Sequence, residues 1–252
     1  MHIHLPKPLH GWREFAGEVG IIVIGVLIAL GAEQIVEQWH WHRQVEESKR
    51  ALKAELTVNV WDAYERLAIQ PCLQGRLNAL ARQIDAGDGE WRAMPETFIG
   101  AKRFYSWVLP PVYRPPTRPV FSDAWRNALA DGTVTHLELE EAQHLSSAYQ
   151  SSDAFNDQEA EEARTETRLS PLATDRHLDE RSRLEMLQTI AELDRLNGLL
   201  VTSSNDLFSA IRSGKLGFSR SEVEALRQDV VQTQRGYRGS CVIMPPLDLG
   251  QG

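Results

Sequence analysis

Two Glu-x-x-His pairs are the residues whose types and spacing could bind metal. Glu37 with His40, and Glu141 with His144, each place a carboxylate and an imidazole about one helical turn apart. Helical bundles that bind two metal ions use this pair on two helices, so a metal-binding bundle enzyme is one hypothesis. The glutamate and histidine content gives roughly 0.7 such pairs by chance. Scattered residues therefore explain both pairs, and we expect no cofactor.

Other motifs that identify an active site do not occur in the sequence. It contains no glycine-rich nucleotide loop, no Gly-x-Ser-x-Gly, no HExxH and no close pair of CxxC motifs. We therefore predict no identifiable catalytic residue, although a missing motif does not exclude activity. The formal net charge of −8 argues against binding to a phosphate backbone, so we expect no nucleic-acid partner.

The two cysteines, Cys72 and Cys241, allow one disulfide. An even count suits an oxidising compartment. Two buried free thiols are the alternative. The acidic run from Asp157 to Glu166 is typical of a solvated helical face, with a calcium-binding or basic-partner surface as the second interpretation.

An apolar segment from Val19 to Ala32 contains no charged or amide side chain. Its length is marginal for a membrane span, but extension to residues 18–36 and the flanking tryptophans Trp12, Trp39 and Trp41 favour a transmembrane anchor. A cleaved signal peptide, with a small-x-small site at Ala29 to Gly31, and a buried core helix are the alternatives.

Small and acidic residues gather on one face of this segment. At 100° per residue, that face carries Glu18, Gly25, Ala29, Ala32 and Glu33. Small residues let transmembrane helices approach closely, and a partner helix would shield the glutamates from lipid. We therefore expect self-association through this face, although glycine and alanine are common in membrane helices in any case.

The orientation of the anchor is not decided by charge, because basic residues stand on both sides of it. An apolar segment close to the N-terminus can act as a signal anchor. We therefore expect a single-pass protein with its N-terminus inside and its folded domain in the periplasm.

Beyond the anchor, helical patterns dominate the sequence. Apolar residues recur at three-, four- and seven-residue spacing from Ile35 to Ile69, and a short helix is expected over 73–85. Further helices are predicted over 122–130, from a Thr135/Glu138 capping box to about 168, over 182–212, and after a Ser219/Glu222 capping box. Strand patterns are nearly absent.

These patterns predict an all-α fold in which an N-terminal transmembrane helix continues into an antiparallel helical bundle. The expected parts are an N-terminal tail (1–17), the anchor (18–36), a helical stalk (37–70), the bundle (71–238) and an irregular tail (239–252). Five prolines make the segment 107–120 extended, either packed across the bundle or offered as a polyproline surface.

The segment EVGIIVIGVLIALGAEQ, from Glu18 to Gln34, followed by an acidic and aromatic stalk, resembles the opening of a group of uncharacterised bacterial membrane-anchored proteins. The resemblance covers about the first sixty residues and carries no activity or site residue. It implies a bacterial inner-membrane protein with a helical domain.

Together these observations predict a membrane-anchored interaction, scaffold or sensory module. Its expected partners are the lipid bilayer and either further copies of itself or another membrane protein. An accessory subunit of a larger membrane complex is a further alternative.

Overall fold

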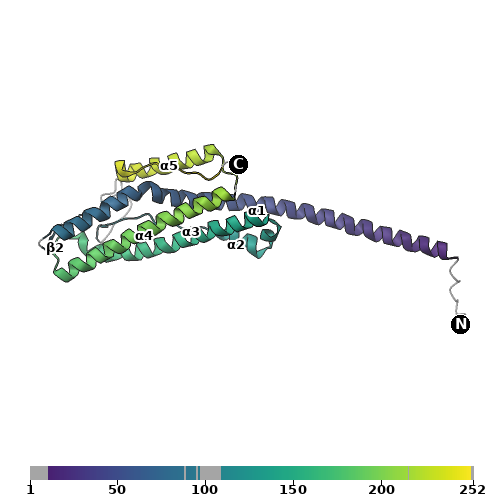
Figure 1. Ribbon diagram of the computed structural model, residues 1–252, viewed down its shortest axis with the longest axis horizontal. Helices are drawn as coiled ribbons and strands as arrows, with labels where there is room; N and C mark the ends of the chain where they lie inside the picture. The colour runs from purple at the N-terminus through teal and green to yellow at the C-terminus, as the bar shows by residue number, and fades with distance from the viewer. Residues whose placement is uncertain (1–10, 88, 95, 97–108, 215, 251–252) are drawn as a thin grey trace, which may run out of the picture. The chain divides into compact units, whose positions relative to one another are not determined.

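The computed structural model shows an all-α protein, as the sequence predicts (Figure 1). It describes residues 11–87, 89–94, 96, 109–214 and 216–250. The helices in chain order are α1 (Gly11–Ala86), α2 (Asp123–Ala130), α3 (Leu139–Glu166), α4 (Glu180–Ser213) and α5 (Arg220–Arg238). Short 3-10 turns, η2 (Thr133–His136), η3 (Thr167–Ala173) and η4 (Gly239–Cys241), and two-residue strands, β1 (Glu90–Trp91) and β2 (Arg176–His177), complete the described part. The first ten residues of the predicted N-terminal tail, residues 107–108 of the proline-rich segment and the last two residues lie outside it.

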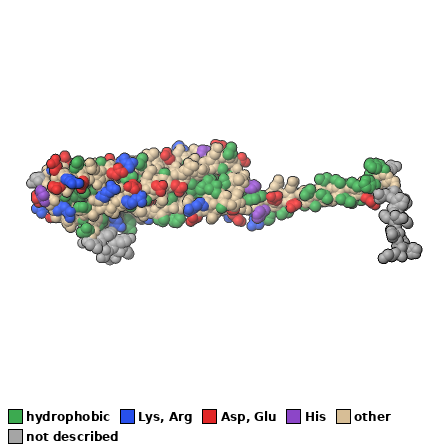
Figure 2. Space-filling model, turned by 90° about the horizontal axis from the view of Figure 1, so that it is seen from below, with side chains coloured by type: hydrophobic (Ala, Val, Ile, Leu, Met, Phe, Trp, Pro, Cys, Tyr) green, Lys and Arg blue, Asp and Glu red, His purple; other side chains and the backbone are tan. Residues whose placement is uncertain are grey.

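Contacts divide the chain into two units between Lys49 and Arg50. In the first unit, α1 is long and apolar enough to cross a membrane, a test that a signal sequence near the N-terminus also passes. Most of its large apolar side chains are exposed, for example 41% at Val19, 75% at Ile21 and 81% at Trp12. Figure 2 shows these apolar side chains gathered along the helix of the first unit.

Helix α1 continues through Pro71, so the predicted break between Ile69 and a separate helix at Leu73 is wrong. A proline inside a helix removes one backbone hydrogen bond and usually bends or ends it. Here Ile69 and Leu73 are buried on either side of the proline, at 0% and 1% exposure, and the nearby Ala68 carbonyl accepts a hydrogen bond from Ile243 N at 2.9 Å. Burial of these side chains on both sides of Pro71 outweighs the local cost of the proline.

Within the second unit, α1 is the central helix. It contacts α3 through Asn59 and Ser152 (3.5 Å between Nδ2 and Oγ), and α5 through Trp61 and Asp229 (2.8 Å between Nε1 and Oδ2). Residues further along α1 bind residues further along α3 and further along α5. The three helices α1, α3 and α5 therefore run in the same direction. Helix α4 runs the opposite way, because Arg183 near its start donates to the Ile84 carbonyl near the end of α1.

An extended segment, residues 109–121, makes the parallel arrangement of α1 and α3 possible. We call it the strap. Its Val112 carbonyl accepts from Arg76 Nε at 2.7 Å, and its Phe121 N–H donates to Asn59 Oδ1 at 3.0 Å. Nine extended residues cover roughly 28 Å, and the α1 segment between these contacts covers about 26 Å. The strap therefore carries the chain back along α1 to the point where α2 and α3 begin.

The prolines of the strap suit this role because a strap that crosses helices makes few backbone hydrogen bonds, and proline has no N–H to satisfy. Val112, Tyr113 and Pro115 are buried. The described residues of the proline-rich segment pack across the bundle, which is the first of the two predicted arrangements.

The C-terminal residues form a second extended segment over α1. Cys241 is bonded to Cys72, with 5.2 Å between their Cα atoms, and Tyr64 donates its hydroxyl hydrogen to the Pro245 carbonyl at 2.8 Å. Val242 and Leu249 are buried at 2% exposure. A tail that is irregular in secondary structure is thus still part of the core.

Two helix starts show how capping chemistry works in this chain. Ser219 and Glu222 form the predicted capping box at the start of α5. The predicted box of Thr135 and Glu138 is wrong, because Thr135 lies in η2 and its hydroxyl donates to the Gly132 carbonyl at 2.8 Å. Gly132, with φ of 80°, turns the chain there, and α3 begins only at Leu139.

Candidate functional site

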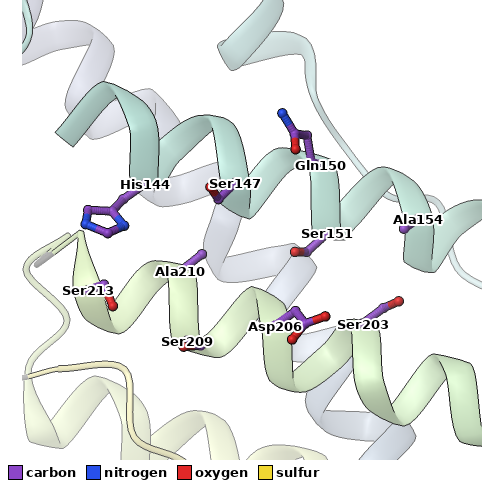
Figure 3. Close-up of a pocket in the computed structure, with 10 residues that line it drawn as sticks. All are labelled: His144, Ser147, Gln150, Ser151, Ala154, Ser203, Asp206, Ser209, Ala210 and Ser213. Atoms are coloured by element: carbon purple, nitrogen blue, oxygen red, sulfur yellow. The ribbon is translucent and has the colours of Figure 1, made fainter. Parts of the chain in front are cut away.

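A surface groove of about 500 Å³ lies between α3 and α4 (Figure 3). Both walls are made of small and polar side chains that recur every three or four residues. Helix α3 supplies His144, Ser147, Gln150, Ser151 and Ala154, and α4 supplies Ser203, Asp206, Ser209, Ala210 and Ser213. We call this surface the serine groove.

Small side chains let α3 and α4 pack closely. At the end of the groove, a side chain at Gly214 would meet His144 Cβ at 3.0 Å. Across the helix pair, Ser203 Oγ donates to Gln158 Oε1 at 3.0 Å. The close approach leaves a shallow channel rather than a closed cavity.

The chemistry of the serine groove is that of hydrogen bonding. Ser147 donates its hydroxyl hydrogen to the Gln143 carbonyl of its own helix at 3.0 Å, so its oxygen lone pairs face outward. His144 Nε2 lies 3.7 Å from Glu140 Oε1 of the same helix. The hydroxyls and the Gln150 amide can donate hydrogen bonds to a polar partner and accept them from it, and the Asp206 carboxylate can accept them.

A buried ion pair lies in the core of the same helices. Arg66 Nη1 and Nη2 donate to the two Glu162 carboxylate oxygens at 2.7 and 2.5 Å, and both side chains are 0% exposed. Arg66 Nη2 also donates to Asn197 Oδ1 at 2.5 Å. Tyr113 donates to Glu162 Oε1 at 2.9 Å and accepts from Asn197 Nδ2 at 2.8 Å.

These contacts hold the ionised forms in place. Burial lowers the pKa of Arg66, but the adjacent Glu162 carboxylate outweighs this effect and the net shift is upward. Burial raises the pKa of Tyr113, and the Glu162 charge raises it further, so the phenol stays neutral and acts as a donor. A bidentate arginine and carboxylate pair with further hydrogen bonds is the arrangement in which a buried ion pair is tolerated.

The acidic run 157–166 is only in part the solvated face that its composition indicates, since Asp157 is exposed and the Glu161 side chain is 43% exposed. Glu159 is 3% exposed and Glu162 is 0% exposed. Their helix turns this part of its surface toward Arg66 on α1 and Arg118 on the strap. Glu162 of this run binds the Arg66 guanidinium of α1, and Glu159 accepts the backbone N–H of Arg118 on the strap.

The predicted metal candidates are not brought together. Glu37 and His40 are exposed in the first unit, and Glu141 and His144 lie on α3 in the second. Over the described ranges, no group of three or more His, Cys, Asp or Glu side chains is arranged to hold a metal ion. His144 instead lines the serine groove.

The other predicted residues have clear positions. Cys72 and Cys241 are joined in a disulfide. Glu18, Gly25, Ala29, Ala32 and Glu33 all lie on α1 in the first unit and are exposed, and a side chain added at Gly25 would meet no atom of the chain within 4 Å.

The sequence interpretation missed the serine groove and the Arg66 network. A signal for the groove exists, because small residues recur at helical spacing on both α3 and α4, as at Ser147, Ser151 and Ala154. No local signal marks Arg66, since an arginine between apolar residues of a helix is equally typical of an exposed face.

Compared with protein-family models, curated proteins and solved structures, the chain matches none. Its functional assignment therefore depends on its own geometry.

The Arg66 network generates a prediction about stability. Replacing Arg66→Met should lower the free energy of unfolding by about 3–5 kcal/mol, because it leaves the Glu162 carboxylate buried and unpaired. Urea unfolding of the full chain in mild detergent, followed by tryptophan fluorescence, measures the change. Arg126→Ala is the control, because the exposed Arg126 and Asp123 pair should contribute at most about 1 kcal/mol. Equal effects of the two substitutions would contradict the assigned role of Arg66.

Proposed function

We propose that this chain is a membrane-anchored helical interaction module. The observation that carries the proposal is the row of exposed apolar side chains on α1, including Ile21 at 75% and Ile28 at 67% exposure. Each such side chain exposed to water costs roughly 1.5–3 kcal/mol relative to burial, and a bilayer removes that cost. The same helix supplies core residues of the second unit from Leu52 onward.

The cysteines support a location of the second unit on the periplasmic side of a bacterial inner membrane. Cys72 and Cys241 lie at a Cα separation of 5.2 Å, which suits a disulfide, and Cys241 is exposed. Disulfides persist in oxidising compartments such as the periplasm. This supports a single-pass topology with the N-terminus inside.

We assign partner binding to the serine groove. The polar walls of the groove suit a partner helix or extended chain that forms hydrogen bonds. The groove is open along α3 and α4, so it is accessible on the surface of the folded unit. Anchoring would raise the local concentration of this surface for partners in or near the same membrane.

We further propose that copies of the chain associate through Gly25, Ala29 and Ala32. Their side chains are small, and the space around Gly25 is open for the backbone of a second helix. Pairing along this face would place Glu18 and Glu33 in the interface rather than against lipid.

The anchor is tested by Leu27→Arg. A positive charge near the bilayer centre costs about 2.5–3.5 kcal/mol for insertion, so the variant should shift largely from the carbonate-resistant membrane fraction to the soluble fraction. Leu139→Arg is the matched control, since Leu139 is an exposed leucine of the second unit (74% exposed, against 62% for Leu27). An alkaline phosphatase fusion after Gly252 should be active. A mature N-terminus near Ala32 or an inactive fusion would refute the anchor or the topology, respectively.

Self-association is tested by Gly25→Leu in a membrane two-hybrid reporter. Added bulk should separate the helices and reduce the signal by roughly tenfold. Val23→Leu, on the opposite side of the helix, should leave the signal unchanged. A full signal from the Gly25 variant would remove this interface.

Partner binding is tested with a photoreactive phenylalanine derivative in living cells. At Ser209 in the serine groove it should yield a protein adduct of defined mass, whereas at the exposed Ser221 on α5 it should not. The same bands from both positions, or none from Ser209, would argue against the groove as the binding surface.

A further inference from the structure

The core of the second unit contains more buried carboxylates than guanidiniums. The carboxylates are Asp62 and Glu65 on α1 and Glu159 and Glu162 on α3, with exposures between 0% and 5%. The guanidiniums are Arg66 on α1 and Arg118 on the strap. Arg118 has a 40% exposed side chain, and the Arg238 charge on α5 also acts on Glu65. If all four carboxyls were ionised, Asp62 and Glu159 would still have no guanidinium hydrogen-bonded to them.

Each guanidinium is already committed to one glutamate. Arg66 binds both oxygens of Glu162. Arg118 Nε and Nη2 donate to Glu65 Oε2 and Oε1 at 2.6 and 3.0 Å. Glu65 also accepts from the Gln234 side-chain amide of α5.

Asp62 and Glu159 receive little compensation. Asp62 Oδ1 lies 3.6 Å from Arg118 Nε, and its buried Oδ2 has no hydrogen-bond partner among the described residues. Within the described part of the chain, Glu159 Oε2 accepts one hydrogen bond, from the Arg118 backbone N–H at 3.4 Å. An ionised carboxylate left in this condition costs several kcal/mol, and protonation removes that cost.

We propose that Asp62 and Glu159 are a buried proton-binding pair that makes the packing of the strap on α1 and α3 sensitive to pH near neutrality. With both carboxyls protonated, Arg118 faces two carboxylic acids and one carboxylate, and the strap stays closed. Loss of the protons places two further negative charges between α1 and α3, where they repel Glu65 and Glu162 and draw in water.

The groups that face this pair come from every packed element. Helix α4 contributes the neutral Asn197 near Glu162. The charges that act directly on the pair are those of Arg118 and Glu65 at Asp62, and those of Arg66, Asp62 and Glu162 at Glu159. The next charged or titratable groups are Tyr113 and Arg114 on the strap, Glu166 on α3 and Arg238 on α5. Arg238 lies toward Glu65 and Glu96, and Arg114 toward Glu166.

Burial is the main cause that shifts the two carboxyls. It raises the pKa of Asp62 to about 7 and that of Glu159 to about 8, with the Arg118 guanidinium opposing the shift at Asp62 and its backbone N–H opposing it at Glu159. Both values lie above those of an unfolded chain, so the folded state binds more protons between about pH 4 and about pH 8. The pair therefore makes stability fall as pH rises through that window. Glu166, with a pKa raised by burial to about 7, acts in the same direction.

The inference goes beyond the proposed function and does not depend on it, because the contacts all lie within the second unit. It is tested on the full chain in mild detergent with Asp62→Asn combined with Glu159→Gln, which imitates the protonated pair. From about pH 5 to about pH 8, the unfolding equilibrium constant of the wild type relative to the variant should rise at least tenfold. Glu140→Gln, at a carboxylate with an 87% exposed side chain, is the matched control and should follow the wild type.

Infrared spectroscopy provides a second measurement that does not require the variant to fold. The wild type at about pH 6 should show the carbonyl absorption of protonated carboxyls, and this absorption should disappear by about pH 9. Hydrogen exchange at the strap, reported by the Arg118 and Phe121 amides, should accelerate over the same range. No protonated carboxyl at pH 6, or parallel loss of stability in wild type and double variant, would overturn the proposal.

Discussion

The fold of the second unit depends on one buried contact, the two-pronged bond between Arg66 and Glu162. Arg66 belongs to α1, Glu162 to α3, and the partners Asn197 and Tyr113 to α4 and the strap, so a single hydrogen-bonded group joins four segments. Apolar packing has no direction and tolerates sliding by one turn. A guanidinium that must bind both oxygens of one carboxylate does not tolerate such sliding. This contact therefore fixes the register of α1 relative to α3, α4 and the strap.

The constraint also accounts for the strap. An antiparallel neighbour can be reached by a short connection, as between α4, which ends at Ser213, and α5, which begins at Arg220. Placing Glu162 beside Arg66 with α1 and α3 parallel requires the chain to return the length of the helix first. The strap does so while its own side chains, Tyr113 and Arg118, complete the polar cluster that it crosses. The prolines and the buried charges are thus parts of one solution.

Sequence patterns predicted what depends on local chemistry. The apolar stripe at Leu52, Leu56 and Val60 and the Ser219 capping box follow from periodicity and from short-range hydrogen bonding, and the structure contains both. The helix through Pro71 and the burial of Glu159 and Glu162 were not predictable in this way. Each depends on tertiary contacts, namely the burial of Ile69 and Leu73 in one case and contacts with Arg66 and Arg118 in the other. For the site, serine spacing was visible, but the groove requires knowledge that α3 and α4 are neighbours.

The cluster also shows why a stable core and a responsive one need not conflict. Arg66 and Glu162 have matched charges and every Glu162 oxygen is bound, so this pair fixes the register. One turn earlier on each helix, Asp62 and Glu159 lie near Arg118, whose Nε and Nη2 already bind Glu65. The same helices thus hold a fully paired layer next to an underpaired one. The strap contacts both layers. The Arg66–Glu162 layer holds the strap in position, and a change of charge at Asp62 and Glu159 acts on that same strap.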